Sequence, residues 1–311
     1  MKNQRNSINP TPGSVRFRMI PVSVPPSEAN GLTKLSEQAE TMRSSILTLT
    51  TDFGIQGPYV AAVKGIVLGL APKTVLVDVT HTIAPQNVLE GAFVLGSIVG
   101  AFPPGTVHLG VVDPGVGTDR RIIAVEVADQ WFIAPDNGLL TCVVRDREPS
   151  QIRHVVNPSI RREHVSSTFH GRDIMAPAAA FLLGGGDPSE LGPRLDQIVR
   201  LSNFSATSVN GSGSLVGEVV FRDSFGNLIT NLSKHEMMSR GSDPLDWVVE
   251  IAGERIEGIC RTYGERLLGS LIALYGSEGW LEIAVVNGDA ARSLAAGPGM
   301  SVWAKRRGYA L

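Results

Sequence analysis

The fold of this chain is organised around the stretch Val111-Val112-Asp113-Pro114-Gly115-Val116-Gly117-Thr118-Asp119-Arg120-Arg121. One apolar segment, 106–112, precedes this loop, and another, 122–127, follows it. The proline and the glycines break regular structure and let the backbone approach a ligand closely. In an open α/β sheet, sites form on loops of this kind, just past the carboxyl end of a strand. Asp113 and Arg120 can therefore face each other, either as a structural ion pair closing a turn or as part of a site.

Strand and helix patterns alternate on both sides of this loop. Apolar and β-branched runs predict strands, and longer apolar segments ended by proline predict helices. The predicted strands are 46–51, 74–79, 106–112, 122–127, 131–134 and 152–156, and the predicted helices are 59–70, 87–101 and 174–183. Because such alternation is typical of βαβ units, we predict an α/β domain over 45–200 with a mostly parallel, Rossmann-like sheet. Asp52, Asp78 and Asp113 then lie at the ends of three strands and are expected at one edge of that sheet.

The pattern changes after a polar linker at 201–214. Beyond it the chain carries short strands and turns with little helix, at 215–221, 228–230, 247–251, 255–260, 271–275, 280–286 and 301–305. Regularly spaced short strands predict a small all-β barrel domain over 215–311. Residues 1–44 differ from both domains, because they are punctuated by proline and lack the apolar core of a secretory signal. We expect a disordered tail, or a true start of the protein at Met42, rather than a targeting peptide.

Composition limits the classes of partner. The 28 basic and 30 acidic residues give a net charge of −2, which is no footprint of a nucleic-acid-binding protein. No apolar run reaches the roughly 20 residues that a membrane span needs, so we expect no membrane association. Cys142 and Cys260 lie far apart in no metal-binding spacing, which is typical of reduced thiols in a cytoplasmic protein.

Two further loops carry candidate functional side chains. His170 lies beside a glycine at the start of a helix, where a histidine can act as acid or base near neutral pH, or simply cap the helix. Phe225 and Asn227 flank a glycine, where they could hold a flat heterocycle or form an ordinary hairpin turn. The first strand is not followed by G-x-G-x-x-G, and the Walker, H-E-x-x-H and G-x-S-x-G motifs do not occur, so we predict no cofactor.

Several motifs, taken together, carry a family resemblance that spans 46–305. In chain order they are Leu49-Thr50-Thr51-Asp52-Phe53-Gly54, Val79-Thr80-His81, Glu90-Gly91-Ala92, Val112-Asp113-Pro114-Gly115-Val116-Gly117-Thr118, Pro135-Asp136-Asn137-Gly138-Leu139-Leu140, Phe169-His170-Gly171-Arg172-Asp173 and Phe225-Gly226-Asn227. With these motifs in this order the chain resembles the S-adenosyl-L-methionine (SAM) hydroxide adenosyltransferases, or SAM hydrolases, which are relatives of the fluorinase and chlorinase enzymes. The family's fold, an α/β domain followed by a small β-barrel, agrees with the two domains predicted above.

The resemblance implies an activity and a set of site residues. Water would cleave SAM at the ribose 5′ carbon, giving adenosine and L-methionine, with His170 and Asp113 holding and deprotonating the water and Arg120 orienting Asp113. The implied substrate contacts are Asp52 to the ribose hydroxyls, Phe225 and Tyr263 around adenine, Asn227 to the nucleoside, Asp223 to the methionine ammonium and Ser277 to the methionine carboxylate. The family also implies a homotrimer, with each site between the α/β domain of one subunit and the barrel of the next.

Three other functions stay open at this point. A metal-dependent hydrolase could use Asp52, Asp78, Asp113 and His170, because hard metal ions take carboxylate ligands. A non-catalytic SAM or adenosine binder would bind stoichiometrically and release no product. A SAM-dependent halogenase would use a halide, which needs no base, whereas water needs a group to take its proton. The presence of both Asp113 and His170 favours water.

Overall fold

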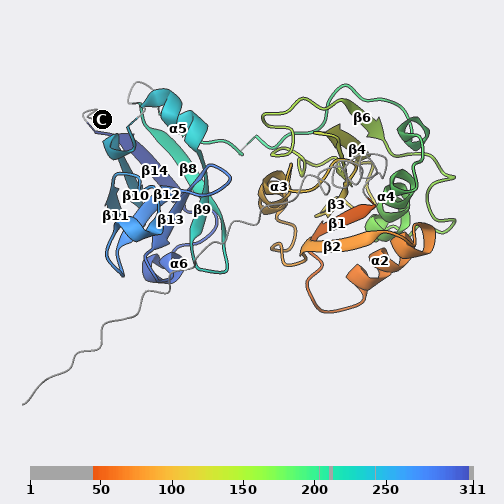
Figure 1. Cartoon of the computed structure of the whole chain (residues 1–311), viewed down its shortest axis with the longest axis horizontal. Coiled ribbons are helices and arrows are strands. Elements are labelled where there is room, and N and C mark those ends of the chain that lie inside the picture. Colours follow the sequence, from red (N-terminus) through yellow and green to blue (C-terminus); the bar gives the residue numbers. More distant parts are fainter. Residues whose placement is uncertain (1–44, 203, 210–212, 242, 308–311) are drawn as a thin grey trace, which may run out of the picture. The chain divides into compact units, whose positions relative to one another are not determined.

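The computed structural model describes residues 45–202, 204–209, 213–241 and 243–307 (Figure 1). The tail predicted at 1–44 lies outside these residues. The first half of the described chain is an α/β region and the second half is built from antiparallel strands. The division predicted at 201–214 stays a prediction; within that segment a short strand, β7 (Thr207–Ser208), pairs with the first long strand of the second half.

The α/β region follows the predicted alternation closely. Its strands are β1 (Ile46–Thr51), β2 (Val75–Thr80), β3 (Val107–Val111), β4 (Ile122–Val127), β5 (Gln130–Pro135) and β6 (Gln151–His154), and its helices are α2 (Tyr59–Leu70), α3 (Val88–Ser97), the π-helical turn η1 (Gly171–Met175), α4 (Ala176–Leu183) and the 3-10 turn η2 (Pro188–Leu191). Helix α2 has the predicted bounds, whereas α3 ends at Ser97 rather than at residue 101.

Alternating side chains of the sheet build two separate cores. Leu47, Leu49 and Leu109 pack with α2 and α4 on one face, and Figure 1 shows these two helices beside the sheet. On β4, Ile123 and Val125 flank the position that is in register with Leu109, and their side chains pack with α3 on the other face. Both faces of these strands are therefore buried, which explains their nearly continuous apolar sequence.

The sheet is mixed, so the predicted mostly parallel, Rossmann-like sheet is confirmed only in part. Its order is β2-β1-β3-β5-β4-β6, and the pairs β1–β2, β1–β3 and β3–β5 are parallel. The pairs β4–β5 and β4–β6 are antiparallel. Only Ala128 and Asp129 separate β4 from β5, and both have positive φ, 52° and 59°. Two such residues form the tight turn that matches the twist of a hairpin, so β4 and β5 must run in opposite directions.

The second half forms a nearly closed antiparallel barrel. Its strands are β8 (Leu215–Arg222), β9 (Leu228–Ser233), β10 (Trp247–Ile251), β11 (Glu254–Glu257), β12 (Leu271–Tyr275), β13 (Trp280–Val285) and β14 (Ser301–Arg306), in the order β11-β10-β14-β8-β9-β13-β12. Four short helical segments, α5 (Lys234–Arg240), η3 (Pro244–Asp246), η4 (Tyr263–Glu265) and α6 (Ala290–Leu294), lie between them. The amide of Cys260 bonds the carbonyl of Ala273 at 2.7 Å, which brings the chain after β11 against β12. The predicted barrel is confirmed in this coarse form.

Candidate active site

The carboxyl ends of β1 and β3 place two carboxylates at one edge of the sheet. Thr51 and Val111 are paired residues of these parallel strands, so the loops that follow them begin side by side. Asp52 and Asp113 are the first acidic residues on those loops, and both line a cavity of about 270 Å³. The rest of the lining is Phe53, Gln86, Val111, Pro114, Val116 and the segment Thr168-Phe169-His170-Gly171. The structure thus brings three of the predicted site residues, Asp52, Asp113 and His170, to one cavity.

Arg120 links the two groups predicted to act on water. Its Nε donates to Oδ1 of Asp113 at 2.8 Å, and its Nη2 contacts Oδ2 of the same carboxylate. Nη2 also lies 2.9 Å from Nδ1 of His170. The side chains of Asp113 and Arg120 are only 5% and 10% exposed, so their attraction is weakly screened. This is one connected group rather than an isolated ion pair.

The contact with Arg120 decides the protonation of His170. A guanidinium only donates hydrogen bonds, so Nδ1 must accept and the proton of the neutral imidazole sits on Nε2. Burial and the charge of Arg120 lower the pKa of His170, and the carboxylates of Asp113 and Asp173 partly oppose them. The imidazole is therefore neutral at physiological pH.

The loop between Asp113 and Arg120 depends on a glycine. Gly117 has φ +82°, a left-handed conformation that glycine adopts without strain, and a Cβ there would clash with the carbonyl oxygen of Ser167. The hydroxyl of Thr118 donates to the carbonyl of Gly115 at 2.7 Å and tightens the same turn. The loop that carries Asp113 and Arg120 therefore packs directly against the segment that precedes His170.

Asp52 is held by the backbone on the other side of the cavity. The amide of Gln86 donates to its Oδ2 at 2.9 Å, and Gln86 itself has φ +66°, unusual for a residue with a side chain. The loop of Gln86 is in turn fixed by Glu90, whose Oε2 accepts from the amide of Ala84 and from Asn87, both at 3.1 Å. Sequence analysis missed Gln86, because nothing in its neighbourhood indicates a left-handed residue.

The predicted substrate-binding residues of the barrel are organised by one turn. Oδ1 of Asp223 accepts from the amides of Phe225 and Asn227 at 2.9 and 2.8 Å, and its Oδ2 accepts from Nδ2 of Asn227 at 2.9 Å. Asn227 is 6% exposed, whereas Phe225 is 77% exposed. The segment is therefore a hairpin turn with an exposed aromatic ring, and binding of a flat heterocycle there stays a prediction.

A second cavity, of about 230 Å³, collects polar groups of the barrel. Asp223, Ser277 and Glu282 line it, together with side chains of α3. Oε2 of Glu282 accepts from the hydroxyl of Tyr263 at 2.9 Å. Burial raises the pKa of Glu282, the hydroxyl of Tyr263 lowers it, and the charge of Asp223 raises it further.

Glu282 is the barrel group that sequence analysis missed. A Cβ at residue 276 would clash with Oε1 of Glu282, so Gly276 is what makes room for this carboxylate. In the sequence Glu282 is a single charged residue in an otherwise apolar strand, and that was the available signal. None of the predicted barrel residues, Asp223, Phe225, Asn227, Tyr263 and Ser277, lines the cavity of Asp113 and His170.

The remaining predicted groups have other partners. Asp78 binds Nζ of Lys64 at 2.6 Å and lies 2.9 Å from Nε2 of His81, away from the cavity lining. Within the described residues, no group of three or more His, Cys, Asp or Glu side chains could hold a metal ion. In the same residues, the helices are all too short or too polar to cross a membrane.

Comparison with known proteins matches both halves of the chain to one family. Residues 47–192 match the model of the SAM hydroxide adenosyltransferase N-terminal domain, and residues 217–303 match that of its C-terminal domain. A curated (R)-S-adenosyl-L-methionine hydrolase of Thermus thermophilus is 37% identical over 261 residues, 81% of this chain and 96% of that protein. One of Methanocaldococcus jannaschii is 35% identical, over 80% and 91%.

More distant and structural relatives agree with this match. A fluorinase of Nocardia brasiliensis is 32% identical over 225 residues, which cover 64% of this chain and 75% of that protein. The crystal structure of an uncharacterized conserved protein from Thermotoga maritima superposes with a TM-score of 0.76 at 35% identity, and covers 84% of this chain and all of that one. The likeness therefore extends over both halves of the fold.

Proposed function

The chain belongs to the SAM hydroxide adenosyltransferase family, and from that premise we infer that it hydrolyses SAM to adenosine and L-methionine. The observation that carries the proposal is the connected group of Asp113, Arg120 and His170 at the cavity that Asp52 also lines. The test is to incubate the purified protein with SAM and identify the nucleoside. Adenosine formed over many turnovers supports the proposal, and stoichiometric binding without product contradicts it.

The reaction is a displacement at carbon. The oxygen of water forms a bond to the ribose C5′, the C5′–S bond breaks, and its electron pair returns to sulfur to give the thioether of methionine. One proton of the water is lost. Because the sulfonium is already a good leaving group, the enzyme mainly has to generate and aim the nucleophile in a dry pocket.

The contacts of Arg120 support a division of labour between Asp113 and His170. The lone pair on Nδ1 of His170 is used by Arg120, so the imidazole offers the water oxygen its Nε2–H as a donor. The carboxylate of Asp113 keeps acceptor capacity beyond its two bonds to Arg120 and takes the proton. Arg120 adds positive charge close to the oxygen on which negative charge develops.

The barrel supplies recognition in this proposal. Asp223 and Glu282 receive the ammonium of methionine, Ser277 its carboxylate, and Phe225 and Tyr263 pack on adenine, with Asn227 held beside them. Because these residues do not line the cavity of Asp113, we propose that each site joins the α/β cavity of one subunit to the barrel of another, in a homotrimer. Co-assembling a variant inactive at His170 with one inactive at Glu282 should restore part of the activity. Absence of restoration would contradict a shared site.

The names of the curated relatives support a preference for one stereoisomer of the substrate. They are called (R)-SAM hydrolases, and we propose that this chain also prefers the R configuration at sulfur. A sulfonium is pyramidal, so with ribose and methionine both anchored only one configuration presents C5′ in line with the water. Rates measured on the two separated epimers test this, and equal rates would contradict it.

Cellular context completes the proposal. Both cysteines, Cys142 and Cys260, are buried thiols outside any disulfide. They support the predicted cytoplasmic location, because thiols persist in a reducing compartment. Alkylation of both only after unfolding, in protein extracted without reductant, is the expected result.

A further inference from the structure

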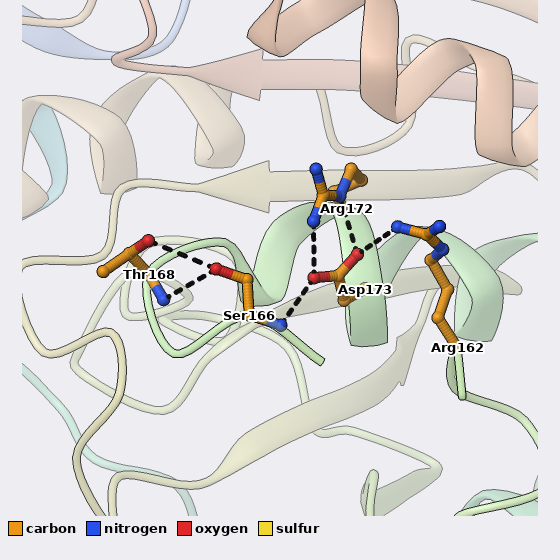
Figure 2. A network of polar contacts seen from close by, with 5 residues as sticks. All are labelled: Arg162, Ser166, Thr168, Arg172 and Asp173. Carbon is orange, nitrogen blue, oxygen red and sulfur yellow. Dashed lines mark hydrogen bonds and ion pairs between the residues drawn. The ribbon is translucent and has the colours of Figure 1, made fainter. Parts of the chain in front are cut away.

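A buried carboxylate lies three residues after His170 (Figure 2). The side chain of Asp173 is 0% exposed and faces two arginines. Arg172 donates to both of its oxygens, at 2.7 and 2.8 Å, and Nη1 of Arg162 donates to Oδ1 at 2.9 Å. Neither the cavity lining nor the proposed chemistry uses this group.

The same carboxylate ties down the loop that leads to His170. Its Oδ2 accepts from the amide of Ser166 at 2.8 Å, and the carbonyl of Asp173 accepts from the amide of Arg162 at 2.9 Å. Within this loop the hydroxyls of Ser166 and Thr168 are 3.3 Å apart. Figure 2 draws this contact beside those of Asp173. Asp173 therefore holds the loop at its start and at its middle.

Two contacts carry this support into the cavity. The carbonyl of Ser167 packs against Gly117, so the loop held by Asp173 also backs the loop that carries Asp113 and Arg120. The guanidinium of Arg172 lies 4.8 Å from the ring centre of Phe169, a wall residue of the cavity. A shift of the loop would move Arg120 and the cavity wall at Phe169 relative to the imidazole of His170.

We propose that Asp173 is the positioning residue of the active site, which holds His170 against Arg120 by fixing the loop between residues 162 and 170. The inference rests on the proposed SAM hydrolysis. Asp173 touches neither substrate nor water. It acts through the geometry of the imidazole, and a displacement of about 1 Å at a reacting group is enough to cost roughly 10²-fold in rate.

The charge of Asp173 also reaches His170. The groups that set the pKa of this imidazole are Arg120, which lowers it together with burial, and Asp113 and Asp173, which raise it. Neutralising Asp173 removes one of the two carboxylates and leaves its arginines unpaired, so the pKa of His170 falls further. A purely structural role would leave that pKa unmoved.

The test compares Asp173→Asn with a matched control. Asp136 is also a buried carboxylate, 1% exposed, which accepts from Nε of Arg121 at 2.7 Å and from the amide of Val199 at 2.8 Å. Asp173→Asn should lower kcat by roughly 10²-fold with little change in KM or in adenosine affinity. Protonation of His170 removes the lone pair that accepts from Arg120, so the acid limb of kcat follows the pKa of His170 and should move to lower pH in this variant. Asp136→Asn should lose stability but keep kcat and the pH profile.

A second variant keeps the proposal testable if Asp173→Asn does not fold, and a second measurement keeps it testable if the protein does not hydrolyse SAM. Arg162→Gln removes one partly exposed ion-pair partner of Asp173 and leaves the pair with Arg172 intact. This variant should therefore fold and show a smaller loss of kcat. NMR titration of the ¹⁵N-labelled imidazole of His170 needs no activity. It should give a lower pKa in Asp173→Asn, where a negative charge is lost, and a higher pKa in Arg162→Gln, where a positive charge that offsets Asp173 is lost. An unmoved pKa, or an equal loss of kcat in Asp136→Asn, would overturn the proposal. Absence of hydrolysis by the wild type would overturn the proposed function alone.

Discussion

The cavity of the α/β region and the predicted substrate-binding residues of the barrel differ in how far their side chains are exposed. In the cavity the charged groups are buried and joined to one another, with Asp113 and Arg120 only 5% and 10% exposed. On the barrel, Phe225 is 77% exposed and Tyr263 is 42% exposed. The polar atoms of Asp223 are used within its own turn.

This difference follows from what each region has to do. Groups that stabilise a developing charge act most strongly when they are held rigidly in a medium of low dielectric constant. Groups that recognise a nucleoside must first admit it, so their aromatic surface stays open until the ligand covers it. In the proposed function, the α/β region therefore carries the reaction and the barrel carries most of the affinity.

The largest expected effect concerns the identity of the nucleophile. A carboxylate fixed beside C5′ repels chloride and fluoride, and this repulsion is stronger in a dry cavity than in water. We expect adenosine as the sole nucleoside product even in concentrated chloride, with oxygen from ¹⁸O-labelled water at its 5′ position. Mass spectrometry of the products measures this. A main product of 5′-chloro- or 5′-fluoro-5′-deoxyadenosine would break the assignment of the reaction to Asp113 and His170.

Replacing His170 should abolish most turnover and spare binding. His170→Ala is expected to lower kcat by about 10²–10³-fold, the usual cost of removing a hydrogen-bond donor aimed at an oxygen on which charge develops. His170→Gln should lose less, because its amide can still donate to the water oxygen although it cannot take a proton. Equal losses in the two variants would indicate that His170 acts as the base that takes the proton of the water. Activity close to the wild type in His170→Ala would remove it from the mechanism.

Replacing Asp52 should weaken binding, even though Asp52 lies in the α/β region. Asp52→Ala leaves the ribose hydroxyls unpaired and should cost on the order of 1–3 kcal/mol, a loss of roughly 5–150-fold in affinity for adenosine and SAM alike. Asp52→Asn, which keeps one acceptor, is the matched control and should lose less. Titration calorimetry with adenosine measures both. Unchanged affinity would contradict the ribose assignment.

More of the cavity than of the sheet or of the barrel's polar residues could be predicted from the sequence. Helix α2 was predictable to the residue, because Pro58 and Pro72 flank a continuous helical pattern. The direction of β4 was not, because an apolar run reads the same in either direction and Ala128-Asp129 is a weak turn sequence. Asp113, Arg120 and His170 were found through motifs on loops. Glu282 and the support that Asp173 gives to the loop depend on contacts between residues that lie apart in the sequence, which no local pattern encodes.

The smallest expected effect belongs to Tyr263, and it tests whether the barrel acts through affinity alone. Tyr263→Phe removes the hydroxyl that favours the charged form of Glu282, so the pKa of Glu282, already raised by burial, rises further. Loss of one hydrogen bond of about 1 kcal/mol predicts a KM for SAM that is about fivefold higher near neutral pH. Because Glu282 now becomes neutral at a higher pH, the weakening of binding in acid should begin at a higher pH in the variant. The acid limb of kcat, which His170 sets, should stay where it is. Full pH profiles of kcat and of kcat/KM separate the two effects, and a shift in the kcat limb would mean that the barrel reaches the reacting atoms.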